Sequence, residues 1–176
     1  MASNSPIELN SFEQNRWMRT LLIRAERIGK EGEVPVCAVV LNDKGHCIGH
    51  GSNQRERFGS PLGHAELAAL QQASRLKQDW RFNECTLIVT LEPCTMCAAA
   101  LVQARMGQVI FSAPDPKRGG LGGTINLANH QSSHHSMRVI GGVEEEAGRK
   151  LLEGWFKQRR QKQRSGEIEA TLSQKD

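Results

Sequence analysis

Two cysteines separated by two residues are the first chemical feature of this chain. Cys94 and Cys97 lie in the stretch TLEPCTMCAAA at 90–100, directly after a proline and before a run of alanines. Such a pair occurs in redox-active dithiols, as half of a structural zinc site, and in catalytic metal sites. The choice among the three depends on which other side chains can join the two thiols.

A histidine and a glutamate upstream favour the catalytic metal site. His64 and Glu66 lie in the stretch GHAE at 63–66. One imidazole and two thiolates supply three zinc ligands and leave the fourth tetrahedral position for water, which is the pattern of catalytic zinc sites. Glu66 is then the candidate catalytic acid and base, because one carboxylate can take a proton from water and return it to a leaving group.

The four candidate side chains can form one site only if they lie at particular positions of their helices. A helix beginning at Cys94 would favour thiolates at its positive end, and the i, i+3 spacing puts both sulfurs on one side of its first turn. His64 and Glu66, two residues apart, point in roughly opposite directions on a regular helix. They can share a site only if His64 lies at the irregular start of its helix, which spacing alone does not establish.

The remaining cysteines are interpreted as small core residues on expected strands: Cys37, Cys47 and Cys85. An odd total of five argues against a disulfide framework and for a reducing compartment, so we expect a cytoplasmic protein. The sequence offers no second close pair to complete a structural zinc site. A redox pair stays open, although it gives His64 and Glu66 no role.

The elements that must position these residues alternate between strands and helices. We expect strands at about 36–41, 46–50, 85–91 and 108–111, the first two as a hairpin. Expected helices cover about 11–28, with a capping box at 11–14, then 64–77, 94–105 and 143 onward. This order predicts a single α/β layered domain with a mixed sheet. We place the domain at 11–164, between a flexible 1–10 segment and a disordered 165–176 tail.

Basic residues gather near the carboxyl end. The net charge is +4, and the stretch KQRRQKQR at 157–164 holds five basic residues. Such an end can add affinity for phosphates, although a solvated helix end explains the same run. No apolar run is long enough to cross a membrane, and the first residues lack the pattern of a secretory signal.

The joint pattern H-x-E, a strand, and P-C-x-x-C at a helix start is the signature of zinc nucleobase deaminases. Over roughly 12–163 the chain resembles one branch of them, the bacterial tRNA-specific adenosine deaminases. The similar stretches are VPVCAVV at 34–40, GSNQ at 51–54, GHAELAAL at 63–70, TLEPCTMCAAAL at 90–101, ARMGQVIFSAPDPKRGG at 104–120 and LLEGWFKQRRQ at 151–161.

The resemblance implies the cytidine-deaminase-like fold, a three-layer α/β/α arrangement with a five-stranded mixed sheet, and a homodimer. It implies one Zn²⁺ per subunit on the ligand set His64, Cys94 and Cys97, with Glu66 as proton carrier. The implied reaction converts adenosine to inosine at the wobble position of a tRNA anticodon stem-loop. The implied substrate contacts are Asn53, the backbone of Ala65, Asp115, and Phe156 on the basic last helix.

Three segments depart from the family pattern. Cys37 stands where glycine is frequent, GGLGG at 119–123 replaces a run of small Ala and Gly residues, and HHSM at 134–137 replaces a frequent Asn-His pair. We therefore assign no RNA contact to His134 or His135. Two other functions stay open. A deaminase of free guanine or cytosine would share the zinc site, and a zinc-stabilised RNA-binding module would normally have a fourth protein ligand.

Overall fold

A single five-stranded sheet forms the centre of the protein, which is represented by a computed structural model describing residues 5–173. The strand order is β2-β1-β3-β4-β5, with bounds β1 Cys37–Leu41, β2 Cys47–Ser52, β3 Thr86–Leu91, β4 Gln108–Ala113 and β5 Arg138–Ile140. β1 pairs antiparallel with β2 and β3, whereas β4 pairs parallel with β3 and β5. The expected mixed sheet is confirmed. β5 has three residues and no clear sequence pattern, so periodicity alone did not predict it.

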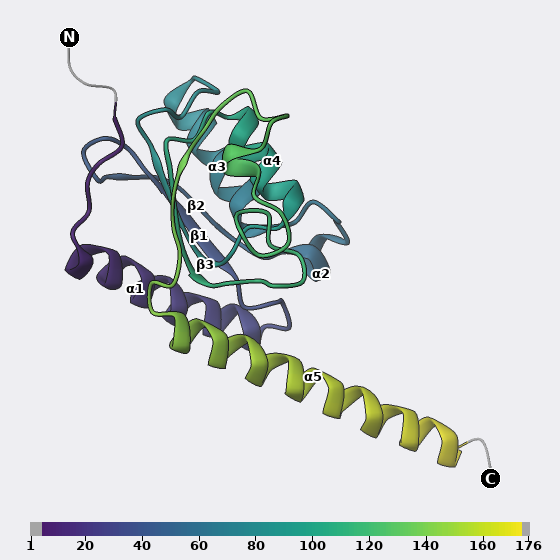
Figure 1. The fold of residues 1–176 in the computed structure, drawn as a ribbon. Helices are drawn as coiled ribbons and strands as arrows, with labels where there is room; N and C mark the ends of the chain where they lie inside the picture. Colours follow the sequence, from purple (N-terminus) through teal and green to yellow (C-terminus); the bar gives the residue numbers. More distant parts are fainter. Residues whose placement is uncertain (1–4, 174–176) are drawn as a thin grey trace.

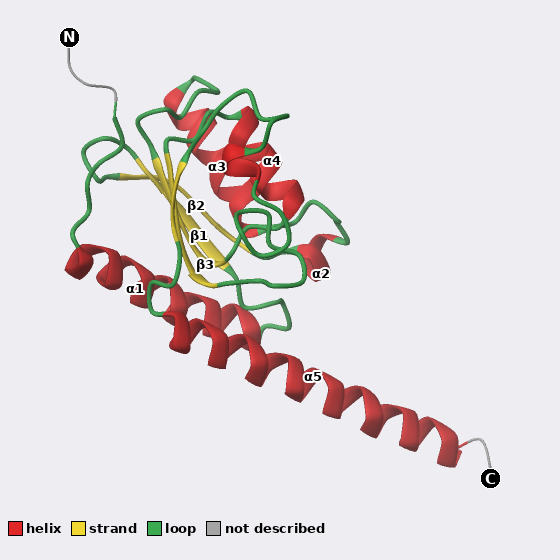
Figure 2. Cartoon of the chain, in the orientation of Figure 1, coloured by secondary structure: helices red, strands yellow, loops and turns green. Residues whose placement is uncertain are grey.

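Helices cover both faces of this sheet, as Figures 1 and 2 show. α1 (Ser11–Lys30) and α5 (Glu145–Ser173) lie on one face, and α3 (Ala65–Lys77) and α4 (Thr95–Gln103) lie on the other. The short α2 (Arg55–Phe58) and the 3-10 turn η1 (Leu127–Asn129) belong to connecting segments. This is the three-layer α/β/α arrangement that the family resemblance implied.

Each face of the sheet carries its own hydrophobic core. Val40, Leu87 and Val109 point towards α3 and α4, whereas Val39, Ile88 and Ile110 point towards α1 and α5. Successive residues of a strand point to opposite faces, so a central strand covered on both sides must be apolar throughout. All five residues of β1 and all six of β4 are buried. The continuous apolar runs in the sequence have this origin.

The end of the segment 1–10, which was expected to be flexible, lies against the core: Ile7 packs against the hydrophobic cluster that contains Leu9. Leu9 is buried, and Asn10 is the N-cap of α1. The Asn10 side chain accepts the Glu13 N–H at 3.0 Å, and Glu13 accepts the Asn10 N–H at 2.9 Å. The capping box therefore begins one residue before the expected Ser11, because asparagine caps helices as well as serine does. Residues 1–4 lie outside the described residues.

α5 runs along α1 and then continues past it (Figure 1). The Trp155 indole donates to the Gly29 carbonyl at 3.0 Å, and the Arg159 guanidinium donates to the Gly32 carbonyl at 3.0 Å. The helix continues to Ser173, into the range 165–176 for which a disordered tail was expected. The residues QKQRSGEIEATL are mostly good helix formers, so the helix propagates beyond its last packed turn. Residues 174–176 lie outside the described residues.

Within residues 5–173, no helix is both long and apolar enough to cross a membrane.

Candidate metal centre

The predicted zinc ligands come from the starts of two helices. His64 is the N-cap of α3, with φ −88° and ψ 145°, and Cys94 is the N-cap of α4, with φ −65° and ψ 169°. Both residues are thus extended, and the helices begin only after them. Residues two apart on a regular helix point in roughly opposite directions, but His64 lies before the regular helix. The imidazole and the Glu66 carboxylate can therefore face one site.

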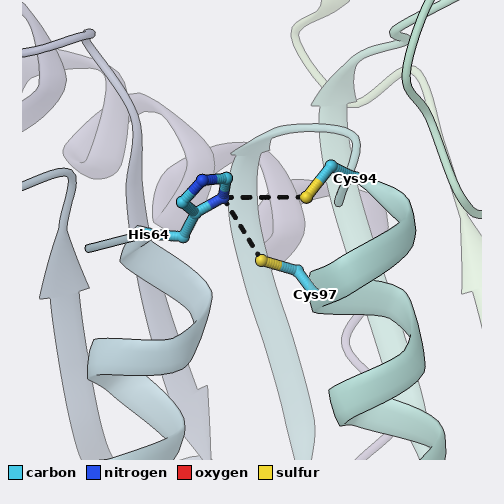
Figure 3. A group of neighbouring side chains, drawn as sticks. All are labelled: His64, Cys94 and Cys97. Atoms are coloured by element: carbon cyan, nitrogen blue, oxygen red, sulfur yellow. Dashed lines mark hydrogen bonds between the residues drawn. The ribbon is translucent and has the colours of Figure 1, made fainter. Parts of the chain in front are cut away.

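The histidine nitrogen lies at the separation from each cysteine sulfur that a tetrahedral zinc ion requires. His64 Nδ1 is 3.7 Å from Cys94 Sγ and 3.4 Å from Cys97 Sγ (Figure 3). Bond lengths of about 2.05 Å to nitrogen and 2.3 Å to sulfur, at a tetrahedral angle, set the N···S separation at about 3.6 Å. Among the described residues, this is the one group of three or more His, Cys, Asp or Glu side chains with converging ligand atoms.

The start of α3 is held close to the sheet by a glycine of β2. Gly51 pairs with Ala38 on β1, and a Cβ at position 51 would collide with the carbonyl oxygen of Ala65. The backbone of α3 therefore touches the backbone of β2 directly, one residue after His64. This close approach fixes the depth of the histidine relative to the sheet.

The pKa values of the two cysteine thiols indicate a binding place for a cation. Hydrogen bonds from Cys97 and His64 lower the pKa of Cys94 to about 4. The neighbouring Cys94 sulfur and burial raise the pKa of Cys97. Two thiolates this close repel each other unless a positive ion lies between them. A divalent cation removes that cost, so the donor set fits zinc, which prefers thiolate and imidazole ligands.

Glu66 lies in the first turn of α3 and is buried, with 4% of its surface exposed. Burial raises the pKa of its carboxyl group from 4.5 to about 6. His64 interacts with it electrostatically, and the Cys97 side chain is a hydrogen-bond partner. A carboxyl group with a pKa near neutrality, beside the ligand group, is suited to accept and return protons.

The four residues expected to contact the substrate differ in burial, in position in the fold and in hydrogen bonding. Asn53 is buried between β2 and α2, and its side-chain oxygen accepts the Arg55 N–H at 3.1 Å. Ala65 is the first residue of α3, where backbone N–H groups have no partner within the helix. The Asp115 side chain accepts the N–H groups of Lys117 and Arg118 at 3.0 and 3.1 Å. Phe156 is on α5 and is 43% exposed.

Sequence reasoning missed two buried carboxylates, each of which accepts backbone N–H groups of a distant segment. Glu33 accepts the N–H groups of Glu56 and Arg57 at the start of α2. Glu92 accepts three N–H groups of the segment that follows β4. The only sequence signal for either is an acid beside an apolar strand, which does not reveal a partner far along the chain.

The fold and the site together define a zinc-binding deaminase. The family of the cytidine and deoxycytidylate deaminase zinc-binding region matches residues 12–113, which include all three ligands and Glu66. The two helix starts that carry the ligands thus belong to the region that defines this family.

Curated relatives narrow the assignment. The tRNA-specific adenosine deaminase of Bacillus subtilis is 36% identical over 85% of this chain and 92% of its own length. That of Haemophilus influenzae is 35% identical over 89% and 91%. A solved structure from a study of tRNA wobble-position deaminases has a TM-score of 0.74 at 33% identity, covering 78% of this chain and 99% of its own. The chain belongs to the tRNA-specific adenosine deaminase family.

A guanine deaminase from Nitrosomonas europaea shares the fold. Its TM-score is 0.65 at 19% identity, over 78% of this chain and 81% of its own. At that identity the likeness concerns the architecture alone.

Proposed function

We propose that the protein hydrolyses adenosine to inosine at the wobble position of tRNA, with release of ammonia. The observation that carries this proposal is the His64, Cys94 and Cys97 group with the buried Glu66 beside it. The family relation supplies the substrate, since the relatives that match most of the chain are tRNA-specific adenosine deaminases.

The metal and Glu66 have complementary tasks. His64, Cys94 and Cys97 would hold a zinc ion, which when bound would lower the pKa of a water molecule for reaction at C6 of the adenine. Glu66 receives the proton of that water on a carboxylate oxygen and delivers it to N1 of the base. The same carboxyl group then protonates the departing amine, so one side chain serves as base and as acid. Burial supports this role because it brings the carboxyl pKa to about 6.

The base is held by groups that border the ligand group. The side chain of Asn53, fixed by its hydrogen bond to Arg55, is proposed to bind the purine edge. The Ala65 N–H at the start of α3 is proposed to donate to the base as well. A base in an anticodon loop leaves its stack at low cost, which makes such a pocket accessible to RNA.

The RNA backbone is proposed to contact the basic half of α5 and the segment after β4. Phe156 is exposed beside Lys157, and its ring packs edge-on against Trp155 at a centroid distance of 5.0 Å. Arg159 forms an ion pair with Glu56 at 3.6 Å, which ties this part of α5 to α2. Asp115 caps its own loop, so its role in RNA binding is to present the exposed Lys117 and Arg118.

Two further properties follow from the family relation as proposals. The enzyme is a homodimer, with α4 as a candidate contact, because its exposed Ala99 and half-buried Ala100 have small side chains that allow helices to approach closely. Light scattering on the purified protein tests this. The second property is the location: the enzyme acts in the cytoplasm, where tRNA is available and its five cysteines stay reduced.

The direct test is incubation of the zinc-loaded protein with a tRNA that carries adenosine at the wobble position, followed by nucleoside analysis. We expect inosine at that position, and no inosine in a matched tRNA with guanosine there. Free guanine, cytosine and adenosine are tested in parallel. Rapid turnover of a free base without activity on tRNA would overturn the proposal in favour of a free-base deaminase.

A further inference from the structure

Glu92 is a buried carboxylate directly after β3, with 2% of its surface exposed. It accepts three backbone hydrogen bonds from one segment. Its Oε2 accepts the Asp115 N–H at 2.8 Å, and its Oε1 accepts the N–H groups of Leu121 and Gly123 at 3.0 and 2.8 Å. Both oxygens are therefore used to fold the segment 113–123, here called the Glu92 loop, around one side chain.

The Glu92 loop also contacts the backbone next to Cys94, the proposed metal ligand two residues after Glu92. The Gly120 N–H donates to the Pro93 carbonyl at 2.8 Å, and Cys94 forms an isolated β-bridge with Gly119. The peptide before Cys94 is thus hydrogen-bonded to the loop, and Cys94 itself is paired with Gly119. The Cys94 sulfur in turn lies 3.7 Å from His64 Nδ1.

The loop packs so closely on Glu92 and α4 that two of its glycines leave no room for a side chain. A Cβ at Gly119 would collide with the Glu92 carboxylate, and one at Gly120 would lie 2.8 Å from the Ala98 Cβ. Glutamate is the suited residue because an ionised carboxylate only accepts hydrogen bonds, and the three groups that face it all donate. A glutamine would turn an NH2 group towards at least one of them.

We propose that Glu92 is a positioning residue for the metal site: by folding the Glu92 loop, it fixes Cys94 in the geometry that binds zinc. The carboxylate itself touches neither metal nor substrate. It acts through the loop and the Cys94 backbone, in the way that groups around metal ligands orient them elsewhere. The inference rests on the proposed function only in taking Cys94 as a zinc ligand.

The test compares Glu92→Gln with the wild type in three measurements on the zinc-loaded protein. Amide exchange is expected to become faster at Asp115, or at Leu121 and Gly123, and to stay unchanged in β1 and β3. Transfer of zinc to an excess of a chelator is expected to become about 10- to 100-fold faster, the range typical of losses around metal ligands. On tRNA, kcat is expected to fall while KM stays near the wild-type value.

Glu33→Gln is the matched control, because it makes the same chemical change in a buried carboxylate that also accepts backbone N–H groups. It should loosen the amides of Glu56 and Arg57 and leave zinc transfer unchanged. Equal acceleration of zinc transfer in both variants would mean general loosening and would overturn the proposal. Faster loop exchange with unchanged zinc transfer would overturn it too, because Cys94 would then be independent of the loop.

Gly119→Ala provides a second route, since its methyl group would displace the loop while Glu92 stays in place. It should accelerate zinc transfer as Glu92→Gln does. If both variants fail to fold by circular dichroism, Glu92 is a requirement of the core and the positioning role is rejected. Exchange and zinc transfer need no substrate, so they decide the matter even if the wild-type protein forms no inosine.

Discussion

His64 and Cys94 occupy equivalent places in the structure: each is the extended residue immediately before a helix, and their side chains meet at 3.7 Å. The positive ends of α3 and α4 therefore converge on the same point. Those ends favour negative charge, which here belongs to thiolates and to Glu66. The site gathers anionic ligands where the backbone itself stabilises them.

Removing one ligand should remove the metal. We expect His64→Ala and Cys94→Ser to purify with little zinc, and to lose the stabilisation that zinc gives to the folded state. That stabilisation is about 4 kcal/mol when free zinc is a thousand times its Kd. Elemental analysis and thermal unfolding with and without a chelator measure both effects. Cys47→Ser is the control that should keep zinc and stability, because Cys47 on β2 is exposed and not in the core where the sequence predicted it. Full zinc content in the ligand variants would reject this ligand set.

Glu66→Gln should separate metal binding from catalysis. The variant keeps all three ligands, so its zinc content should equal that of the wild type. Its rate of inosine formation should fall by at least about 100-fold, because proton transfer by a positioned side chain contributes about 10²- to 10⁴-fold. Glu26→Gln changes an exposed acid of α1 and should leave the rate unchanged. A near-normal rate in Glu66→Gln would assign the proton transfer to another group.

The same substitution should change how the stability of metal-free protein depends on pH. Burial raises the pKa of Glu66 from 4.5 to about 6, so the folded state binds its proton more tightly than the unfolded state does. The wild type therefore loses stability as pH rises through 6, by about 2 kcal/mol in total. We expect Glu66→Gln to be the more stable protein at pH 8, with the advantage gone near pH 4. Urea unfolding in the presence of a chelator measures it; a difference that does not vary with pH would contradict the burial argument.

Charge on the far half of α5 should affect tRNA binding through salt. Replacing Lys157, Arg160, Lys162 and Arg164 by glutamine removes exposed cations and leaves the contacts of Arg159 intact. We expect weaker binding, with the slope of log K against log salt reduced by about 0.7 for each lost phosphate contact. Filter binding across a salt series measures this, and Lys44→Gln in the β1–β2 turn is the control. An unchanged slope would remove α5 from the RNA interface.

The ligand set and the layered fold were predictable because short stretches of the sequence carry the signal for each. Cys94 and Cys97 are three residues apart at a helix start, and the continuous apolar runs of β1 and β4 predict strands buried on both faces. The strand β5 was not predictable in this way, since its exposed Arg138 and half-buried Val139 and Ile140 depend on β4 for their pairing. The structure also continues α5 to Ser173, whereas the composition after residue 164 predicts solvation and does not reveal the continuation of a helix.

The sequence by itself determined which groups could bind a metal, since ligand chemistry depends on residue type and these residues lie close to helix starts. Only the tertiary structure decided that His64 stands before its helix, so that Glu66 and the imidazole can face one site. It also decided the partners of Glu92, whose three donors lie 23 to 31 residues further along the chain. Such contacts arise when β3, α4 and the loop after β4 pack together, and no local pattern encodes a distance in space.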